Sequence, residues 1–172
     1  MTSTPSRRIL LVTHLWRTDA QELAAGVATR LIAAGVGVSA SRGGRGGPPL
    51  ARGPGGGGAG PGPDESAAAG CGLGCVLGGD GTILRGAELS RGSGVPLLGV
   101  NLGHVGFLAE AEREDLDVTV ERIVAREYHV EERTTLEVRA EEDGRTVFQS
   151  WALNEVTVEK ASRERMLELT VE

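Results

Sequence analysis

Aromatic residues and long apolar runs are scarce in this sequence. Only 3% of the 172 residues are aromatic and 27 are glycine, so aliphatic side chains must fill whatever core the 40% hydrophobic content allows. No apolar run reaches the roughly 18 residues that a membrane-spanning helix needs, and residues 1–8 lack the pattern of a signal peptide. We therefore expect a cytoplasmic protein that does not act at a membrane.

Cysteine is also rare. Cys71 and Cys75 lie four residues apart, with no second Cys or His pair at metal-ligand spacing. This spacing argues against a structural metal site and against a disulfide framework.

The net charge of -6 is unevenly distributed. Residues 1–63 carry seven arginines and two acidic residues, whereas residues 64–172 carry 11 basic and 22 acidic side chains. The excess of acidic side chains in residues 64–172 would repel the phosphate backbone of a nucleic acid, so we expect no nucleic-acid partner.

The chain opens with the pattern of a strand followed by a helix. Residues 7–13 form a short apolar run typical of a buried strand, and apolar residues then recur at helical spacing up to Gly35. Asp19 and Glu22 have the spacing of a capping box, which would begin this helix. Residues 36–40 predict a second strand.

Residues 41–63 form a tract of low complexity. Sixteen of these 23 residues are glycine or proline, and Leu50 is the only large apolar side chain. A segment of this kind buries too little surface to offset its ordering entropy, so we predict that it is disordered.

The next elements alternate between strands and helices. Strands are predicted at 73–77 and 96–100, and helices at 82–89 and at about 114–126. This alternation is typical of an α/β fold, so we predict an open parallel, Rossmann-like sheet in a domain spanning residues 1–126.

After residue 127 the hydrophobic period changes from helical to alternating. Two predicted strands, 135–140 and 146–160, flank Asp143 and Gly144, a strong hairpin signal. A third strand is predicted at 166–171. We therefore expect residues 127–172 to be the incomplete start of an all-β domain, and the chain to be a fragment that is inactive alone.

A Gly-Gly-Asp-Gly turn joins the predicted strand 73–77 to a helix start. Backbone N–H groups and the helix dipole at such a turn favour a bound phosphate, although a plain tight turn explains the glycines equally well. A tight turn does not need a carboxylate, however, and Asp80 would repel a phosphate held in the same loop. Asp80 fits better if it faces a hydroxyl as a general base, or orients a Mg²⁺ ion. No Walker lysine is present, so this is not a P-loop.

Two other places carry polar residues of interest. The loop 101–110 follows the carboxyl end of a predicted parallel strand, where open α/β sheets bind ligands, and His104 within it is either an acid–base group or a local hydrogen-bonding group. Asn154 and Glu155 fall in the alternating run 151–158, where Asn is unusual. They are either a functional pair or a solvent-facing pair at a bulge.

These motifs together resemble the NAD kinase family in its bacterial form. The resemblance is carried by Val-Leu-Gly-Gly-Asp-Gly-Thr at 76–82, by Leu-Leu-Gly-Val-Asn-Leu-Gly-His-Val-Gly-Phe-Leu-Ala-Glu at 97–110, and by Ala-Leu-Asn-Glu-Val at 152–156. It implies an enzyme that moves the γ-phosphoryl group of ATP to the 2′-hydroxyl of the adenosine ribose of NAD, with a divalent metal such as Mg²⁺. The cleft would lie between an α/β domain and a β domain.

The resemblance also implies roles for individual residues. Asp80 matches the proposed general base, and Gly81 adjoins it in the NAD site. Arg85 lies where the family has a basic contact, Asn154 and Glu155 match the pair that holds the nucleotide, and Arg165 falls where another basic residue reaches the ligand. No metal-ligating residue is assigned, and a homo-oligomer is expected for the complete protein.

Two other functions stay open on the sequence. A lipid or sugar kinase that shares the Gly-Gly-Asp-Gly motif is one, although Asn154, Glu155 and the loop at Asn101 favour a nucleotide substrate. A non-catalytic, nucleotide-binding fragment is the other.

Overall fold

The computed structural model describes residues 7–14, 17–42, 67–103, 108–157 and 159. The chain divides into two compact units, Met1–Val130 and Glu131–Glu172. Residues 43–63 of the low-complexity tract lie outside the described residues. The same is true of the predicted strand 166–171, His104 and Arg165.

The first unit is built on a five-stranded sheet in which every pair of neighbours is parallel. The strand order is β2-β1-β3-β4-β5. The strands are β1 (Arg8–Thr13), β2 (Gly37–Arg42), β3 (Leu73–Leu77), β4 (Leu97–Asn101) and β5 (Ala111–Glu112). The predicted open parallel sheet is therefore confirmed, with β5 as a short edge strand that the sequence pattern did not reveal.

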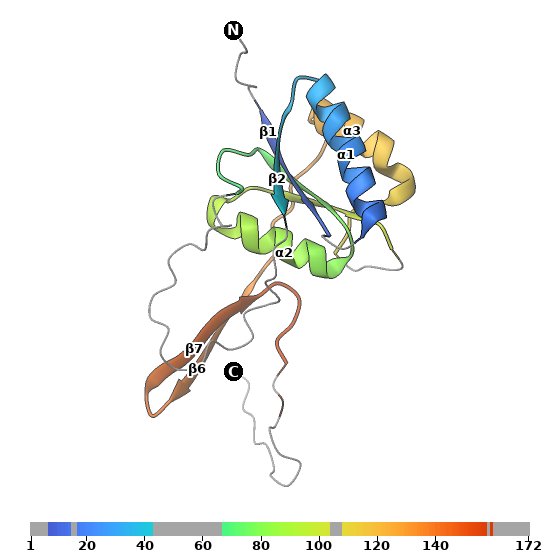
Figure 1. Cartoon of the computed structure of the whole chain (residues 1–172). Coiled ribbons are helices and arrows are strands. Elements are labelled where there is room, and N and C mark those ends of the chain that lie inside the picture. Colours follow the sequence, from blue (N-terminus) through green and yellow to red (C-terminus); the bar gives the residue numbers. More distant parts are fainter. Residues whose placement is uncertain (1–6, 15–16, 43–66, 104–107, 158, 160–172) are drawn as a thin grey trace. The chain divides into compact units, whose positions relative to one another are not determined.

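Helices cover both faces of this sheet (Figure 1). One face carries α1 (Thr18–Ala33) and α3 (Leu116–Ala125), which lie side by side and are joined by ion pairs from Arg30 to Asp117 and Glu121. The other face carries α2 (Asp80–Ser90). Short 3-10 turns, Arg91–Ser93 and Arg113–Asp115, follow α2 and precede α3.

Alternation along the strands produces two separate apolar clusters. In β1, Ile9 and Leu11 pack toward α1 and α3, whereas Leu10 and Val12 pack toward α2. All five residues of β3 are buried. Parallel strands that are covered on both faces read as near-continuous apolar runs, which is why the sequence predicted these strands well.

Glycines let α2 approach the sheet closely. A Cβ added at Gly86 would lie 2.6 Å from Cγ2 of Val76, and one added at Gly99 would lie 2.6 Å from Cδ1 of Ile83. Such distances are well inside van der Waals contact, so larger residues would push the helix away from the strands. The start of α2, where Asp80 lies, is thereby held against the end of β3.

Two local predictions were wrong. No side chain caps α1, because Arg17 is the N-cap residue and Asp19 lies within the first turn. The second strand continues to Arg42, two residues into the tract predicted to be disordered. The helix predicted at about 114–126 is confirmed: it starts as a 3-10 turn and ends at Ala125, and Arg126 closes it in a left-handed conformation with φ of 62°.

The second unit contains an antiparallel hairpin of β6 (Leu136–Glu142) and β7 (Arg145–Ala152). Asp143 and Gly144 connect the strands with φ values of 50° and 72°, as the turn of such a hairpin requires. This confirms the predicted hairpin. The predicted strand 146–160 is too long, however, because β7 ends at Ala152 and residues 153–157 are irregular.

The two cysteines are free, and they face opposite sides of the sheet. Cys75 belongs to the cluster under α1 and α3, and Cys71 to the cluster under α2. Burial raises the pKa of the Cys75 thiol to about 12, so it is a protonated, apolar core residue at neutral pH. Among the described residues, no helix is both long and apolar enough to cross a membrane.

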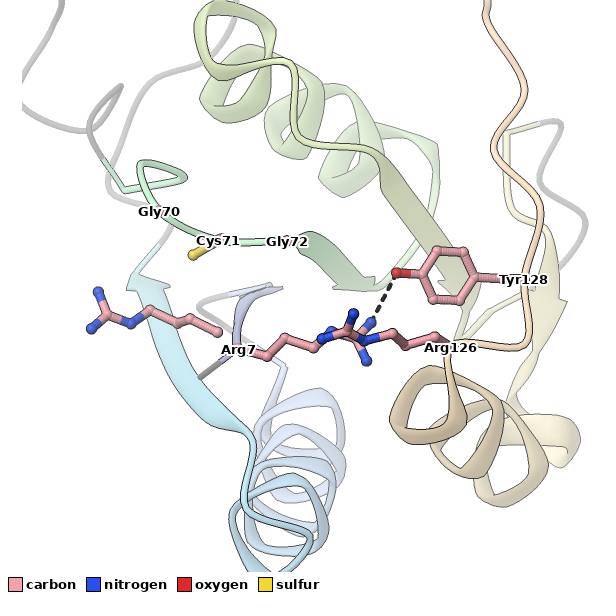
Figure 2. Close-up of a pocket in the computed structure, with 7 residues that line it drawn as sticks. Arg7, Gly70, Cys71, Gly72, Arg126 and Tyr128 are labelled. Carbon is pink, nitrogen blue, oxygen red and sulfur yellow. Dashed lines mark hydrogen bonds between the residues drawn. The ribbon is translucent and has the colours of Figure 1, made fainter. Parts of the chain in front are cut away.

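The amino-terminal edge of the sheet carries a pocket of about 370 Å³ (Figure 2). It is lined by residues that precede or begin β1, by the turn before β3, and by the segment after α3: Arg7, Arg8, Gly70, Cys71, Gly72, Arg126 and Tyr128.

Candidate active site at the carboxyl edge of the sheet

The strand order defines where a ligand is expected. From β1 the chain passes through α1 to β2 on one side, and from β3 it passes through α2 to β4 on the other side. The order therefore reverses between β1 and β3. In open α/β sheets the crevice outside the carboxyl ends of such strands is the usual ligand site.

Gly78 makes the turn that leaves β3. It is buried, and its N–H donates to the carbonyl oxygen of Val100 at 3.0 Å. A Cβ at this position would lie 2.6 Å from Oγ1 and 2.8 Å from Cβ of Thr82. Because the Thr82 Cβ is fixed to the helix backbone, only glycine fits here.

Gly79 and Gly81 differ from Gly78 because packing does not require them to be glycine. Both are exposed, and a Cβ added at either would meet no described atom within 4 Å. Bare backbone therefore faces solvent at the start of α2. The first N–H groups of a helix have no partner within it, so this start is suited to an anion such as a phosphate group.

Asp80 is the first residue of α2 and is partly buried. Its Oδ1 accepts a hydrogen bond from the backbone N–H of Leu108 at 3.2 Å. This bond ties the carboxylate to the far end of the loop that follows β4. The carboxylate is thus held in a defined place beside the exposed glycine backbone.

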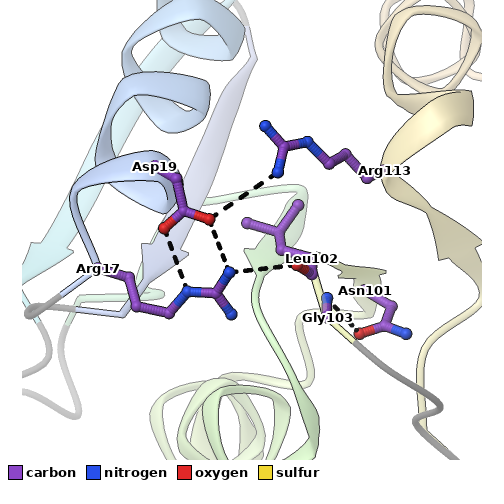
Figure 3. Close-up of polar contacts among 6 residues, drawn as sticks. All are labelled: Arg17, Asp19, Asn101, Leu102, Gly103 and Arg113. Atoms are coloured by element: carbon purple, nitrogen blue, oxygen red, sulfur yellow. Dashed lines mark hydrogen bonds and ion pairs between the residues drawn. The ribbon is translucent and has the colours of Figure 1, made fainter.

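The near end of the same loop is fixed by Asn101. Its side chain is only 2% exposed, and its Oδ1 accepts a hydrogen bond from the N–H of Gly103 at 3.1 Å. Arg17 reaches this loop from the start of α1 and donates to the carbonyl oxygen of Leu102 at 3.3 Å (Figure 3). The segments that follow β1 and β4 are therefore connected at this edge.

Arg17 is itself oriented by Asp19. Its Nε and Nη2 donate to the two carboxylate oxygens of Asp19 at 3.1 and 2.6 Å, and Arg113 lies 3.9 Å from Asp19 Oδ2 (Figure 3). The hydrogen bond from Arg17 holds the pKa of Asp19 below its ordinary value, and the same bond raises the pKa of Arg17. The bidentate pair gives the guanidinium a fixed direction toward the loop.

Sequence reasoning missed this cluster because Asp19 was interpreted as part of a helix cap. The signal was present in the sequence. An arginine and an aspartate two residues apart, directly after a buried strand, are placed at the carboxyl edge of a parallel sheet.

The other predicted site residues are distributed over both units. Arg85 lies on α2, where its Nη1 pairs with Glu88 Oε2 at 2.8 Å, and its side chain is 24% exposed. Asn154 and Glu155 belong to the second unit, where both are exposed and follow the end of β7 rather than lying within a strand. The structure thus brings Asp80 and Gly81 together with Arg85 on one helix.

A resident metal site is not evident in the described part of the chain. No group of three or more His, Cys, Asp or Glu side chains there is arranged to hold a metal ion.

Comparison with known proteins finds relatives of this chain among the NAD kinases. Residues 62–128 match the ATP-NAD kinase N-terminal domain. The NAD kinase of Leifsonia xyli subsp. xyli is 50% identical over 166 residues, which is 96% of this chain and 54% of that protein. NAD kinase 2 of Streptomyces coelicolor is 47% identical over 172 residues, or 100% of this chain and 56% of that protein.

Over almost its whole length, the chain is thus similar to about half of two bacterial NAD kinases. It spans about half the length of the curated relatives that it matches.

A solved structure has a similar fold. The crystal structure of yeast NADH kinase complexed with NADH aligns with a TM-score of 0.64 at 21% identity. The alignment covers 88% of this chain and 48% of the yeast chain. This likeness concerns the fold of the chain.

Proposed function

We propose that this chain supplies the Asp80 edge of an NAD kinase site, at which ATP phosphorylates the 2′-hydroxyl of the adenosine ribose of NAD. The observation that carries the proposal is Asp80, a carboxylate tethered to the Leu108 N–H, beside glycines that packing does not require. The relatives named NAD kinase support the choice of nucleotide over a lipid or a sugar.

The proposed reaction is an in-line phosphoryl transfer. The ribose 2′-oxygen forms a bond to the γ-phosphorus, the bond from that phosphorus to the oxygen bridging the β- and γ-phosphates breaks, and ADP leaves. The proton of the 2′-hydroxyl goes to the carboxylate of Asp80, which acts as general base. The exposed backbone of Gly79 and Gly81 lets a ligand approach the start of α2, where the helix dipole favours phosphate oxygens.

A divalent ion fits this site as a companion of ATP. Mg²⁺ is usually held by one or two carboxylates together with substrate phosphates, so it needs no cluster of protein ligands. Asp80, at the start of α2, would help to hold the ion, which would neutralise charge on the phosphates.

The remaining nucleotide contacts belong to the same proposal. Arg85, Asn154, Glu155 and Arg165 would contact NAD or ATP, and a cytoplasmic homo-oligomer would be the active form. Arg17, through Leu102, would position the loop after β4 against the bound nucleotide.

Replacing Asp80 with Asn tests the base directly. In any form of the protein that makes NADP, this chain or a longer one, we expect Asp80→Asn to lower kcat by about 10²- to 10⁴-fold. Affinity for NAD should change little, because the amide keeps the shape and the hydrogen bond from Leu108. NADP formation and NAD binding are measured separately, by a coupled assay and by calorimetry.

Glu121→Gln is the matched control, because it removes an exposed carboxylate on α3, far in sequence from the glycine turn. This variant should keep full turnover. Near wild-type kcat in Asp80→Asn at neutral pH would remove Asp80 from the role of general base, and absence of NAD binding by every form of the protein would contradict the proposed substrate.

A further inference from the structure

The pocket at the amino-terminal edge of the sheet lies at the opposite ends of β1 and β3 from Asp80. Its walls come from three places in the sequence: the start of β1, the Gly70–Gly72 turn, and the segment after α3. Backbone hydrogen bonds fix two of these walls to each other, because the Gly72 N–H donates to the carbonyl oxygen of Arg8 at 2.8 Å. The pocket is therefore part of the folded sheet rather than a gap between loops.

Arg7 is a half-buried cation in this pocket that has only neutral partners. Its Nη1 donates to the carbonyl oxygen of Ile123 at 2.6 Å, and its Nη2 donates to the Tyr128 hydroxyl at 2.8 Å (Figure 2). The guanidinium also lies 5.8 Å from the centroid of the Tyr128 ring. These contacts fix its position, but they leave its positive charge without a carboxylate within the described part of the chain.

Two more arginines line the same pocket. Arg8 and Arg126 are exposed, and among the described residues neither forms an ion pair. The backbone of Arg126 is fixed in the left-handed conformation that closes α3. Burial raises the pKa of the Cys71 thiol, and the positive charge of Arg8 partly offsets that rise.

Several other arginines pair with carboxylates. Arg17, Arg30 and Arg85 each do so, as expected in a chain with 24 acidic residues. The lining residues of the pocket include three arginines and no carboxylate, so the lining carries net positive charge in an acidic protein.

We propose that the pocket lined by Arg7, Arg8, Arg126 and Tyr128 binds a small phosphate-bearing anion, at a site separate from the one that contains Asp80. Arginine side chains from two segments of the chain supply positive charge and several N–H donors, which match the several oxygens and the multiple charge of phosphate. A volume of about 370 Å³ suits a small ligand of this kind. The proposal does not depend on the proposed kinase activity, because no residue of the pocket belongs to the carboxyl edge.

The test is a titration of the whole 172-residue chain with sodium diphosphate, at constant ionic strength, followed by backbone amide NMR spectra. We expect saturable shifts at Gly70, Gly72 and Tyr128. Shifts at Gly79 and Gly81 are recorded in the same spectra, so that binding at the carboxyl edge is distinguished from binding here. Citrate, which has a similar charge at neutral pH, is the second ligand and should bind more weakly than diphosphate.

Arginine variants identify the donors. Arg8→Gln and Arg126→Gln should each weaken diphosphate binding about tenfold, the effect typical of losing one hydrogen-bonded charged group. Both side chains are exposed, so both variants should fold. Arg122→Gln, an exposed arginine on α3 that does not line the pocket, should leave the affinity unchanged.

Four results would overturn the proposal. They are the absence of saturable shifts at Gly70, Gly72 and Tyr128, unchanged affinity in both pocket variants, equal weakening in Arg122→Gln, and binding of citrate as tight as that of diphosphate.

Discussion

The sheet of the first unit and the hairpin of the second are both made of strands, yet their side chains are in very different surroundings. Every residue of β3 and four of the six in β1 are buried, whereas no residue of β6 or β7 is. The sheet is parallel and the hairpin antiparallel, but in both the backbone groups are paired, so the contrast in side-chain burial is the one that bears on packing. A two-stranded hairpin is marginally stable by itself, and the apolar clusters of the sheet are what hold the Asp80 edge in place.

Deleting buried and exposed side chains should give the largest contrast between these regions. Leu10 is fully buried under α2, so Leu10→Ala should lower the free energy of unfolding by about 2–5 kcal/mol. Val147 on β7 is 49% exposed, so Val147→Ala should change the free energy of unfolding by less than about 0.5 kcal/mol. Urea denaturation measures both. Equal losses would show that the hairpin is as well packed as the sheet.

Two glycines of the first unit allow buried and exposed helix faces to be compared, because a Cβ added at each meets different surroundings. Gly86→Ala should destabilise the protein by about 1–3 kcal/mol, because the new Cβ would press on Val76. Gly26 lies on the exposed face of α1 with no described atom within 4 Å of a Cβ, so Gly26→Ala should stabilise by about 0.5–1 kcal/mol. Thermal unfolding gives the sign of each change, and stabilisation by both alanines would mean that α2 is packed loosely.

Removing the exposed Arg17–Asp19 ion pair should have the smallest effect on stability. Because the pKa of Asp19 is lowered in the folded protein, the pair contributes stability above the unfolded-state pKa of about 3.9. That stability is lost as the pH falls through the lower folded-state value. Asp19→Asn should therefore flatten the fall in Tm below about pH 4, and the difference should vanish in about 1 M salt. A wild-type curve that matches the variant at low salt would show that the pair contributes nothing.

The sequence predicted the parts of the fold in which burial on both faces leaves continuous apolar runs. The strand 73–77 was placed residue for residue, and Asp143 with Gly144 located the hairpin turn. Asp80 was placed at a strand-to-helix turn for the same reason, since glycine and carboxylate follow a buried strand directly.

The features that the sequence did not predict depend on contacts between distant residues, which no local pattern encodes. Asp19 has the spacing of a helix cap, but its carboxylate pairs with Arg17 instead. The same guanidinium donates to the carbonyl oxygen of Leu102 in the loop after β4, a contact over 85 positions. The end of β7 at Ala152 was missed because alternation continues in the sequence beyond the last paired residue. The arginine pocket joins residues 7 and 128, which lie 121 positions apart.

The central claim is that the nucleotide binds at the turn between β3 and α2. Titrating the chain with NAD and recording backbone amide NMR spectra tests this claim most directly. The account predicts saturable shifts at Gly79, Gly81 and Thr82, and at Asn101 and Gly103 in the loop after β4, with smaller changes at Gly70 and Gly72. Shifts confined to the amino-terminal edge, or no saturable shift at the start of α2, would contradict it.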